Sequence, residues 1–397
     1  MMEPLKVAIF EPYVWERAYG NLRYINYIFR YLDRTRFLPV LIVQRRTAYT
    51  DTVERSGVEV ITMPAPRSLA AYNRELLHKG PLAKGWALGA ILAFNLRIAR
   101  TLRHHRITVL QCHNVRSVLM AGIGARLVGC PVILYVKTTL ISPTLDRLAF
   151  HLARLVLFQN RLNLEACQPS LQRYRNKFEV LVNGVDLEEI DRAAQSGQSA
   201  GPQLRKSIGL LSDRLNLACL ATLSPAKGID YLLQAMKIVQ QYERVALYIL
   251  GTDEQFPSYR SELETFARQY LTDVHFLGWR EEPLCILSLM DALVLPSLHE
   301  DAPRSVMEAM ALGKPVIATR VGGLPSMLEE GGNGFLVPAR DAAALADSII
   351  ELARNPERRE RMGKAAFAVA RQRYSLATNV QSLQRLYSRL TGAPSLN

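Results

Sequence analysis

The chain has 397 residues, and its 49 Lys and Arg residues outnumber its 36 Asp and Glu residues, which gives a net charge of +13. Hydrophobic residues make up 49% and charged residues 21% of the chain, so a disordered or fibrous protein is excluded. At about 100–200 residues per domain, this length predicts two domains.

Apolar runs and cysteines narrow the class of protein further. No apolar run reaches the roughly 20 residues that cross a bilayer, and the short apolar stretch at 7–10 is too brief for a signal peptide. The five cysteines lack metal-ligand spacing. We therefore expect reduced thiols in a cytoplasmic protein.

The basic residues are concentrated in the first half of the chain. Residues 1–190 hold 26 Lys and Arg against 14 Asp and Glu, a net charge of +12, whereas residues 191–397 hold 23 against 22. The first half is therefore expected to meet an anionic partner or surface.

Short apolar runs alternate with amphipathic stretches through the first half. Strands are expected at 6–10, 40–44, 109–112, 132–136, 155–158 and 179–182. Helices are expected from about residue 20 and at 88–102, 118–127 and 162–174. This alternation predicts a parallel sheet with helices on both faces.

The same pattern restarts after a short stretch rich in small residues. Strands are expected at 215–220, 246–250, 274–276, 292–295, 316–319 and 334–337. Helices are expected at 229–240, 259–270, 284–290, 305–311, 325–329, 342–355 and 378–390. The chain is therefore predicted to be α/β, with two doubly wound Rossmann-like domains that face each other across a ligand-binding cleft.

The domain limits follow from the low-complexity stretch 193–203, which predicts a linker. The first domain is then 1–192 and the second 204–375, and a C-terminal helix within 376–397 is able to pack back on the first domain.

The most informative segment is 295–308, where a predicted strand, a polar loop and a helix follow one another. Pro303 suits the first turn of that helix. The next three backbone N–H groups would form a site for a diphosphate, and they belong to Arg304, Ser305 and Val306. Glu300 lies in the loop and Glu308 in the helix, so they would contact different parts of one elongated ligand. A helix cap with a solvated acid is the alternative.

Around this segment the chain resembles family 4 of the retaining glycosyltransferases, also described as glycosyl transferases group 1. Glu300 and Glu308 match the family's paired-glutamate motif. The other matching motifs, in the family's order, are NGVD at 183–186, LSPAKGID at 223–230, VHFLG at 274–278, VGGLP at 321–325 and GFLV at 334–337. The resemblance covers nearly the whole chain and implies the GT-B fold.

The resemblance also implies roles for these residues. Glu308 would accept hydrogen bonds from the ribose hydroxyls of a nucleotide-diphosphate sugar, Glu300 would contact the transferred sugar, and Lys227 would bind the leaving diphosphate. Carboxylates suit hydroxyls because they only accept hydrogen bonds, and an ammonium stabilises the charge of the leaving group without a metal. A UDP- or GDP-sugar is the expected co-substrate, with no cofactor required.

Two positions depart from the family pattern. Thr222 stands where a second diphosphate-binding cation is usual, and Lys137 stands where a histidine is usual. Lys137 is either a compensating cation near the donor, a sign of a degraded site, or a solvated residue. Arg280 is a candidate for contact with the nucleobase of the donor.

The first strand–helix loop matches the family's glycine pair only in Gly20. Trp15 and Arg17 of this loop are candidates for an acceptor site, with simple packing as the alternative. His113 follows the predicted strand 109–112 and so faces the predicted cleft. A structural histidine is at least as good an interpretation, and no catalytic role is assigned to it.

The basic stretch 79–106 carries Arg97, Arg100 and Arg103 at three-residue steps, which places the three arginines on one helix face. Trp86 and the apolar residues at 88, 91 and 92 would insert into lipid headgroups while the arginines meet anionic lipid. Alternatively, the apolar side packs on the sheet. In the family, the N-terminal domain usually binds the acceptor, so a membrane-attached acceptor would account for its charge.

The function expected from this resemblance is transfer of a sugar to a saccharide or lipid-linked acceptor, with retention, at the inner face of the cell membrane. A catalytically impaired GT-B scaffold in polysaccharide assembly is the main alternative, and a sugar-nucleotide epimerase is another. Nucleic-acid binding has only the charge in its favour.

Overall fold

The computed structural model describes residues 3–12, 14, 20–65, 81–137, 142–165, 167–199, 201–253 and 256–393, and the side chains at 20 and 81–88 lie outside the description. The chain divides into two compact units. Unit 1 comprises residues 1–181 and 377–397, and unit 2 comprises residues 182–376.

Unit 1 is built on a seven-stranded sheet in the order β3-β2-β1-β4-β5-β6-β7, in which the described pairs are parallel. Its strands are β1 (Leu5–Phe10), β2 (Phe37–Val43), β3 (Glu59–Thr62), β4 (Ile107–Cys112), β5 (Val132–Val136), β6 (Leu155–Phe158) and β7 (Phe178–Val180). Its helices are α1 (Gly20–Tyr31), α2 (Ala48–Arg55), α5 (Pro81–His104), α6 (Val115–Leu127), α7 (Pro143–Leu152), α8 (Arg161–Glu165) and α17 (Leu376–Thr391).

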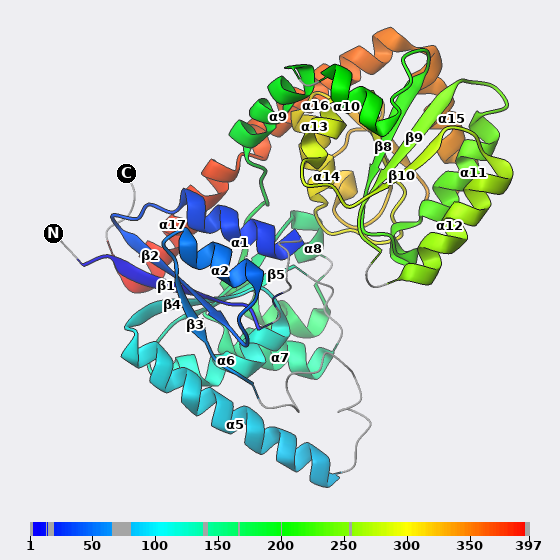
Figure 1. Cartoon of the computed structure of the whole chain (residues 1–397). Coiled ribbons are helices and arrows are strands. Elements are labelled where there is room, and N and C mark those ends of the chain that lie inside the picture. The colour runs from blue at the N-terminus through cyan, green and yellow to red at the C-terminus, as the bar shows by residue number, and fades with distance from the viewer. Residues whose placement is uncertain are drawn as a thin grey trace. The chain divides into compact units, whose positions relative to one another are not determined.

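The helices of unit 1 cover both faces of its sheet (Figure 1). Phe94 and Ile98 of α5 and Phe150 of α7 pack into one apolar cluster with the strands. The predicted helix at 162–174 is divided instead into α8 and a 3-10 helix, Pro169–Lys177, because Pro169 lacks the N–H that a continuous helix requires. Elements α2, β3 and α7 were not among the expected ones.

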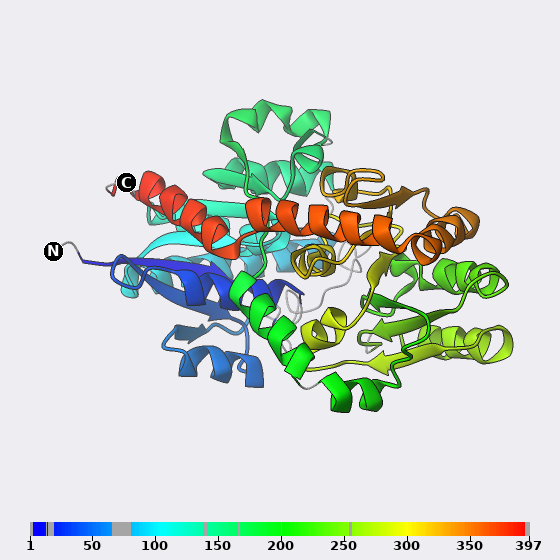
Figure 2. The same cartoon turned by 90° about the horizontal axis from the view of Figure 1, so that it is seen from above.

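Helix α17 packs on unit 1, although it is the last element of the chain (red in Figure 2). The Tyr24 hydroxyl donates to Asn379 Oδ1 at 2.7 Å, and the backbone N–H of Asp33 donates to Gln384 Oε1 at 2.6 Å. Tyr387 is fully buried beside the Phe37 ring. The C-terminal helix is therefore part of the core of unit 1.

Unit 2 is built on a six-stranded sheet in the order β10-β9-β8-β11-β12-β13, and its described pairs are parallel. Its strands are β8 (Leu215–Leu220), β9 (Val245–Leu250), β10 (Val274–Gly278), β11 (Ala292–Leu295), β12 (Val316–Thr319) and β13 (Gly334–Val337). Its helices are α9 (Leu187–Ser199), α10 (Gly201–Ile208), α11 (Ile229–Val239), α12 (Pro257–Tyr270), α13 (Pro283–Ser288), α14 (Arg304–Ala311), α15 (Ala342–Arg354) and α16 (Pro356–Arg373).

One apolar cluster of unit 2 includes residues of α9, α13, α14 and α16, and another includes residues of α11, α12 and α15, so each face of the sheet has its own layer (Figure 1). Helix α16 was not predicted. The helix predicted at 325–329 is a single 3-10 turn, Leu324–Ser326.

The structure places the boundary between the two units at residue 181, earlier than the predicted 192. The stretch 193–203, which was predicted to be a linker, lies within unit 2. Most of that stretch lies in α9 and α10 (green in Figure 2). Its small residues serve packing rather than flexibility. Ala193 is buried, and a Cβ at Gly197 would lie 2.1 Å from Ser288 Oγ of α13.

In both sheets the strand order reverses between two central strands, β1 and β4 in unit 1 and β8 and β11 in unit 2. Ligands of doubly wound sheets bind at the carboxyl ends of the strands at such a reversal. The loop after β12 belongs to this edge in unit 2. Gly322 there has φ +51°, and a Cβ would lie 1.5 Å from the carbonyl oxygen of Glu300.

We predict that Tyr387→Phe lowers the stability of unit 1. Its hydroxyl donates to Gln111 Oε1 at 2.5 Å, and both side chains are fully buried. Loss of the donor leaves a buried acceptor unsatisfied, which costs about 1–3 kcal/mol. Urea unfolding followed by circular dichroism measures the change. Tyr242→Phe, at an exposed site, is the control, and equal midpoints for the two variants would contradict the prediction.

We predict that Gly322→Ala destabilises unit 2 by about 2 kcal/mol or more, because backbone strain at positive φ adds to a clash with Glu300. Gly209→Ala is the matched control, since Gly209 has φ +65° but its nearest neighbour would be 3.7 Å from the new Cβ. Thermal unfolding should show a much larger loss for Gly322→Ala. Equal losses of melting temperature in the two variants would show that the close approach of Gly322 to the Glu300 carbonyl does not affect stability.

Candidate active site

An ion pair between Lys227 and Glu300 occupies the strand-order reversal of unit 2. Lys227 follows β8 in the 3-10 turn Pro225–Lys227, and Glu300 lies in the loop after β11. Their Nζ and Oε1 atoms are 2.5 Å apart, and the exposed fractions of the two side chains are 26% and 9%. The two loops are also tied by the Leu298 N–H, which donates to the carbonyl of Ala226 at 2.9 Å. Two residues predicted from separate motifs thus meet in one site.

Buried hydroxyls hold the Glu300 carboxylate in place. Ser297 Oγ donates to Glu300 Oε1 at 2.8 Å, and the Thr319 hydroxyl at the end of β12 donates to the carbonyl of Ser297. Both hydroxyl residues are fully buried. The sequence analysis missed them. Ser297 lies within the loop it singled out, but only the fold brings Thr319 beside that loop.

The described contacts of Glu300 fall on one carboxylate oxygen. Lys227 and Ser297 both donate to Oε1, and Oε2 has no hydrogen-bond or ion-pair partner among the described residues. This oxygen is the one available to a ligand hydroxyl.

Glu308 belongs to a second ion pair on the helix that follows. Arg304 Nη2 donates to Glu308 Oε1 at 2.9 Å across one turn of α14, and Glu308 is buried. Helix α14 begins at Arg304 after Pro303, which has no side-chain acceptor for the first-turn N–H groups. The N–H groups of Arg304, Ser305 and Val306 therefore make up the first turn, as the sequence predicts, and suit an anion. Glu300 and Glu308 have different partners, and their contacts with different parts of a ligand stay a prediction.

Thr222 and Arg280 lie on the same edge of the sheet, in the loops after β8 and β10, and both are exposed. Arg280 Nε donates to the carbonyl of Leu277 at 3.1 Å. Their predicted contacts with a donor stay predictions.

In unit 1 a chain of hydrogen bonds leads from α17 to the carboxyl end of β1. Tyr387 donates to Gln111, and Gln111 Nε2 lies 2.6 Å from His113 Nε2. His113 Nδ1 lies 2.9 Å from Asn21 Oδ1, and Asn21 Nδ2 donates to Glu11 Oε2 at 2.6 Å. Each of the four side chains from Tyr387 to Asn21 donates to the next member of the chain, and the Glu11 carboxylate is the final acceptor.

The direction of this chain assigns the tautomer of His113. Its Nε2 accepts from the Gln111 amide, so its Nδ1 carries the proton and donates to Asn21. Burial lowers the pKa of His113 well below its usual value, and the nearby Lys137 ammonium lowers it further. The imidazole is therefore neutral and structural, in accord with the sequence interpretation.

Lys137 follows β5 and lies against two tyrosine rings. Its Nζ is 3.4 Å from the ring centroid of Tyr24 and 4.6 Å from that of Tyr135, distances at which the ammonium is stabilised by the aromatic faces. The ammonium is half-buried at the carboxyl edge of the unit 1 sheet. Its proposed role as a compensating cation stays a prediction.

Several residues of unit 1 that were predicted to bind donor, acceptor or membrane lie outside the residues that the structure describes. Gly20 is the first residue of α1, and its predicted approach to a donor stays a prediction. Trp15 and Arg17 lie outside the described residues. So does the side chain of Trp86 on α5.

Helix α5 packs its apolar side on the core and exposes a mixed face. Ile91 packs against the cluster that contains Phe94 and Ile98, so the expectation that Ile91 enters lipid is wrong. Arg97 is exposed and donates to the carbonyl of Pro64 at 3.0 Å. The exposed face carries four residues at helical spacing, namely Leu92, Leu96, Arg100 and Arg103.

All five cysteines are buried and none forms a disulfide. Burial raises the pKa of the Cys219 thiol to about 12, so it is not a ready nucleophile. Among the described residues, no cluster of His, Cys, Asp or Glu side chains is arranged to hold a metal ion. No helix of the described chain combines the length and apolar character needed to cross a membrane.

Residues 202–369 match the family model described as glycosyl transferases group 1. Spore coat protein SA of Bacillus subtilis (strain 168) is 28% identical over 226 residues, which are 54% of this chain and 59% of that protein. The UDP-Gal:alpha-D-GlcNAc-diphosphoundecaprenol alpha-1,3-galactosyltransferase of Escherichia coli is 23% identical over 278 residues, 65% of this chain and 69% of that enzyme. The chain thus spans less than two thirds of the length of the first relative and slightly more of the second.

Solved structures resemble the whole chain. A glycosyltransferase from Rickettsia africae ESF-5 aligns with a TM-score of 0.84 at 14% identity, over 98% of this chain and 99% of that one. Anabaena Alr3699/HepE in complex with UDP-glucose aligns with a TM-score of 0.76 at 20% identity, over 97% and 100%. The expected fold class is confirmed: the chain has the GT-B fold, and its second unit carries the match to glycosyl transferases group 1.

Proposed function

We propose that the protein is a retaining glycosyltransferase that moves a sugar from a nucleotide-diphosphate sugar to a saccharide or lipid-linked acceptor. The observation that carries this proposal is the Lys227–Glu300 pair beside the first turn of α14. A cation, a helix N-terminus and two buried carboxylates on one sheet edge suit a diphosphate joined to hydroxyl-bearing groups.

The donor would be a UDP- or GDP-sugar, and unit 2 would bind it. Lys227 has further N–H groups to donate to the diphosphate, beside the N–H groups of Arg304, Ser305 and Val306. Glu300 Oε2 would accept from the transferred sugar and Glu308 from the ribose. The complex of Anabaena HepE with UDP-glucose, on the same fold, supports this class of donor.

Transfer would proceed by front-face attack. The acceptor oxygen forms a bond to the anomeric carbon on the side from which the diphosphate leaves, so the configuration is retained. The electron pair of the broken bond goes to the leaving phosphate oxygen, which takes the acceptor proton. Lys227 would stabilise the negative charge that develops there, with no metal required.

Unit 1 would bind the acceptor and a membrane surface at the inner face of the cell membrane. It holds 28 Lys and Arg against 11 Asp and Glu, whereas unit 2 holds 21 against 25. The face of α5 that combines Leu92 and Leu96 with Arg100 and Arg103 suits anionic headgroups. The diphosphoundecaprenol in the printed name of the Escherichia coli relative supports a lipid-linked acceptor and a role in cell-surface polysaccharide or glycolipid synthesis.

A catalytically impaired scaffold of a polysaccharide assembly complex is the second candidate. Thr222, where relatives of the resembled family carry a second cation, and Lys137, which lies against tyrosines, favour it. Transfer or donor hydrolysis by the purified protein, screened with UDP-, GDP- and ADP-sugars that raise its melting temperature, would exclude it.

We predict that Glu308→Ala and Lys227→Ala each lower the rate of sugar transfer by about 10²-fold or more, because each removes a polar group aimed at the donor. Radiolabelled-sugar transfer measures the rate. Lys227→Ala also leaves Glu300 buried without its cation, so the neutral pair Lys227→Met with Glu300→Gln separates folding from chemistry. Glu262→Ala and Lys237→Ala, at exposed sites of unit 2, are matched controls. Wild-type rates for both site variants would refute the assignment.

We predict that Arg100→Ser with Arg103→Ser weakens binding to phosphatidylglycerol vesicles by about tenfold or more, at roughly 1 kcal/mol for each basic residue near the surface. Vesicle co-sedimentation at low salt measures the binding, with phosphatidylcholine vesicles as the uncharged reference. Lys237→Ser with Arg268→Ser removes the same charge from exposed sites of unit 2. If both double variants lose the same affinity, α5 is not the contact surface.

A further inference from the structure

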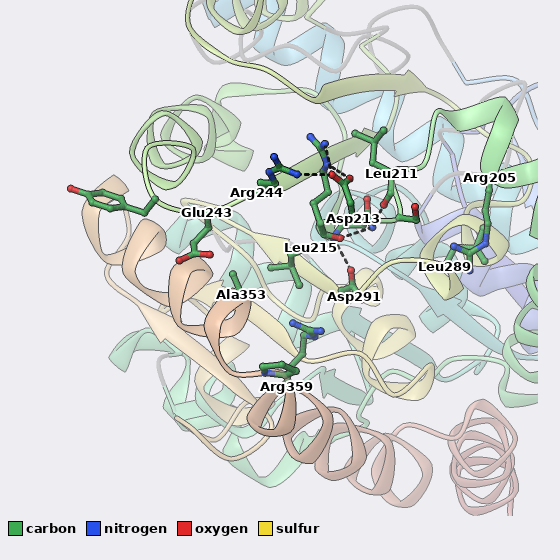
Figure 3. A pocket seen from close by; sticks show the side chains of 15 residues that line it. Arg205, Leu211, Asp213, Leu215, Glu243, Arg244, Leu289, Asp291, Ala353 and Arg359 are labelled. Atoms are coloured by element: carbon green, nitrogen blue, oxygen red, sulfur yellow. Dashed lines mark hydrogen bonds and ion pairs between the residues drawn. The ribbon is translucent and has the colours of Figure 1, made fainter.

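Two cavities lie at the amino edge of the unit 2 sheet, opposite the candidate active site. The larger, of about 690 Å³, lies beside Leu215 at the start of β8, Arg244 just before β9 and Asp291 just before β11 (Figure 3). The smaller, of about 410 Å³, is lined by α9, α10, α13 and the turn between α14 and β12. They share Arg205 and Leu289.

The acids of the larger cavity already have partners. Asp213 accepts from Arg214 and from Arg244, and Glu243 pairs with Arg354 (the first two pairs are drawn in Figure 3). Asp291 Oδ2 accepts from the backbone N–H of Asn216 at 2.7 Å. This cavity is therefore largely balanced in charge.

The smaller cavity has a different balance. Its two charged lining residues are Arg205 and Lys314, both cations. Neither side chain forms a hydrogen bond or an ion pair with the described residues. Lys314 is half-buried, and burial, together with repulsion from Arg205, lowers its pKa despite the attraction of Asp291. Arg205 is exposed and Lys314 has only the attraction of Asp291, without a hydrogen bond or an ion pair, so an anionic ligand would stabilise the half-buried ammonium further.

The remaining lining defines the kind of anion. Leu289 and Leu312 form an apolar wall, and Gln198 offers an amide for hydroxyl groups. A cavity of about 410 Å³ falls in the range of small-molecule sites, roughly 300–1,000 Å³. A phosphate monoester carries about −1.5 to −2 charges at pH 7, which balances two cations better than a carboxylate does.

We propose that this cavity binds a small phosphorylated metabolite, with its phosphate between Arg205 and Lys314 and its organic part along Leu289 and Leu312. The site is separate from the donor site, because it lies at the opposite ends of the strands. It does not depend on the proposed function.

Isothermal titration of the full chain with ribose 5-phosphate, in phosphate-free buffer, tests the proposal. We expect saturable binding that is lost in Lys314→Met and weakened in Arg205→Gln. Because Arg205 is exposed, its substitution should leave the fold intact. Lys206→Gln, one residue further along α10 and exposed but outside the cavity lining, should bind as the wild type does. Absence of saturable binding, or equal affinity in the wild type and both cavity variants, would overturn the proposal.

Two further arms identify the ligand and the site. Inorganic phosphate should bind about tenfold more weakly than ribose 5-phosphate, since it gains nothing from the apolar wall, and equal affinities would overturn the assignment of an organic ligand. Lys227→Ala, which alters the candidate donor site, should leave ribose 5-phosphate binding unchanged. Loss of binding in Lys227→Ala with retention in Lys314→Met would place the anion at the donor site and refute the second site.

Discussion

The common direction of the strands is the constraint on which both units depend. Because paired strands run parallel, every loop that leaves a carboxyl end lies on the same edge of its sheet, and the reversal of strand order separates two of these loops enough to admit a ligand. In unit 2 this edge carries Lys227 and Glu300. In unit 1 the equivalent edge carries Glu11, His113 and Lys137, which end three different strands. At the opposite, amino edge of the unit 2 sheet lie the two cations Arg205 and Lys314, which line the smaller cavity.

The carboxyl edges of the two sheets are stabilised in different ways. In unit 2 an ion pair and a buried hydroxyl act on a single oxygen of Glu300, while the close approach of Gly322 restricts the backbone of its loop. Such support holds a carboxylate in one orientation before a ligand arrives, which limits the ordering that binding must provide. In unit 1 a one-way chain from Tyr387 to Glu11 does the same through neutral groups. Helix α17 is therefore linked through this chain to Glu11, which directly follows β1.

The division into units sharpens the meaning of the net charge. Counting by sequence halves assigns +12 to the first half, but α17 adds two arginines to unit 1, and the acids just after residue 181 belong to unit 2. Unit 1 then carries +17 and unit 2 carries −4. A unit that is negative overall can attract an anionic ligand only through local cations, so Lys227, Arg205 and Lys314 matter more than the total charge suggests.

Much of the protein could be predicted from its sequence, because apolar periodicity reflects local geometry. The six strands of unit 2 lie where their apolar runs predict them, and Glu300, Glu308 and Lys227 stood out in motifs of fixed spacing. The stretch at 193–203 misled the analysis, since small residues look the same in a flexible linker and in helices that pack closely. Only the tertiary structure decided which distant residues meet: Thr319 with Ser297, Tyr387 with Gln111, and α17 with unit 1. These contacts join residues 22 to more than 270 positions apart, and no local pattern in a single sequence encodes them, because they arise from the packing of whole elements.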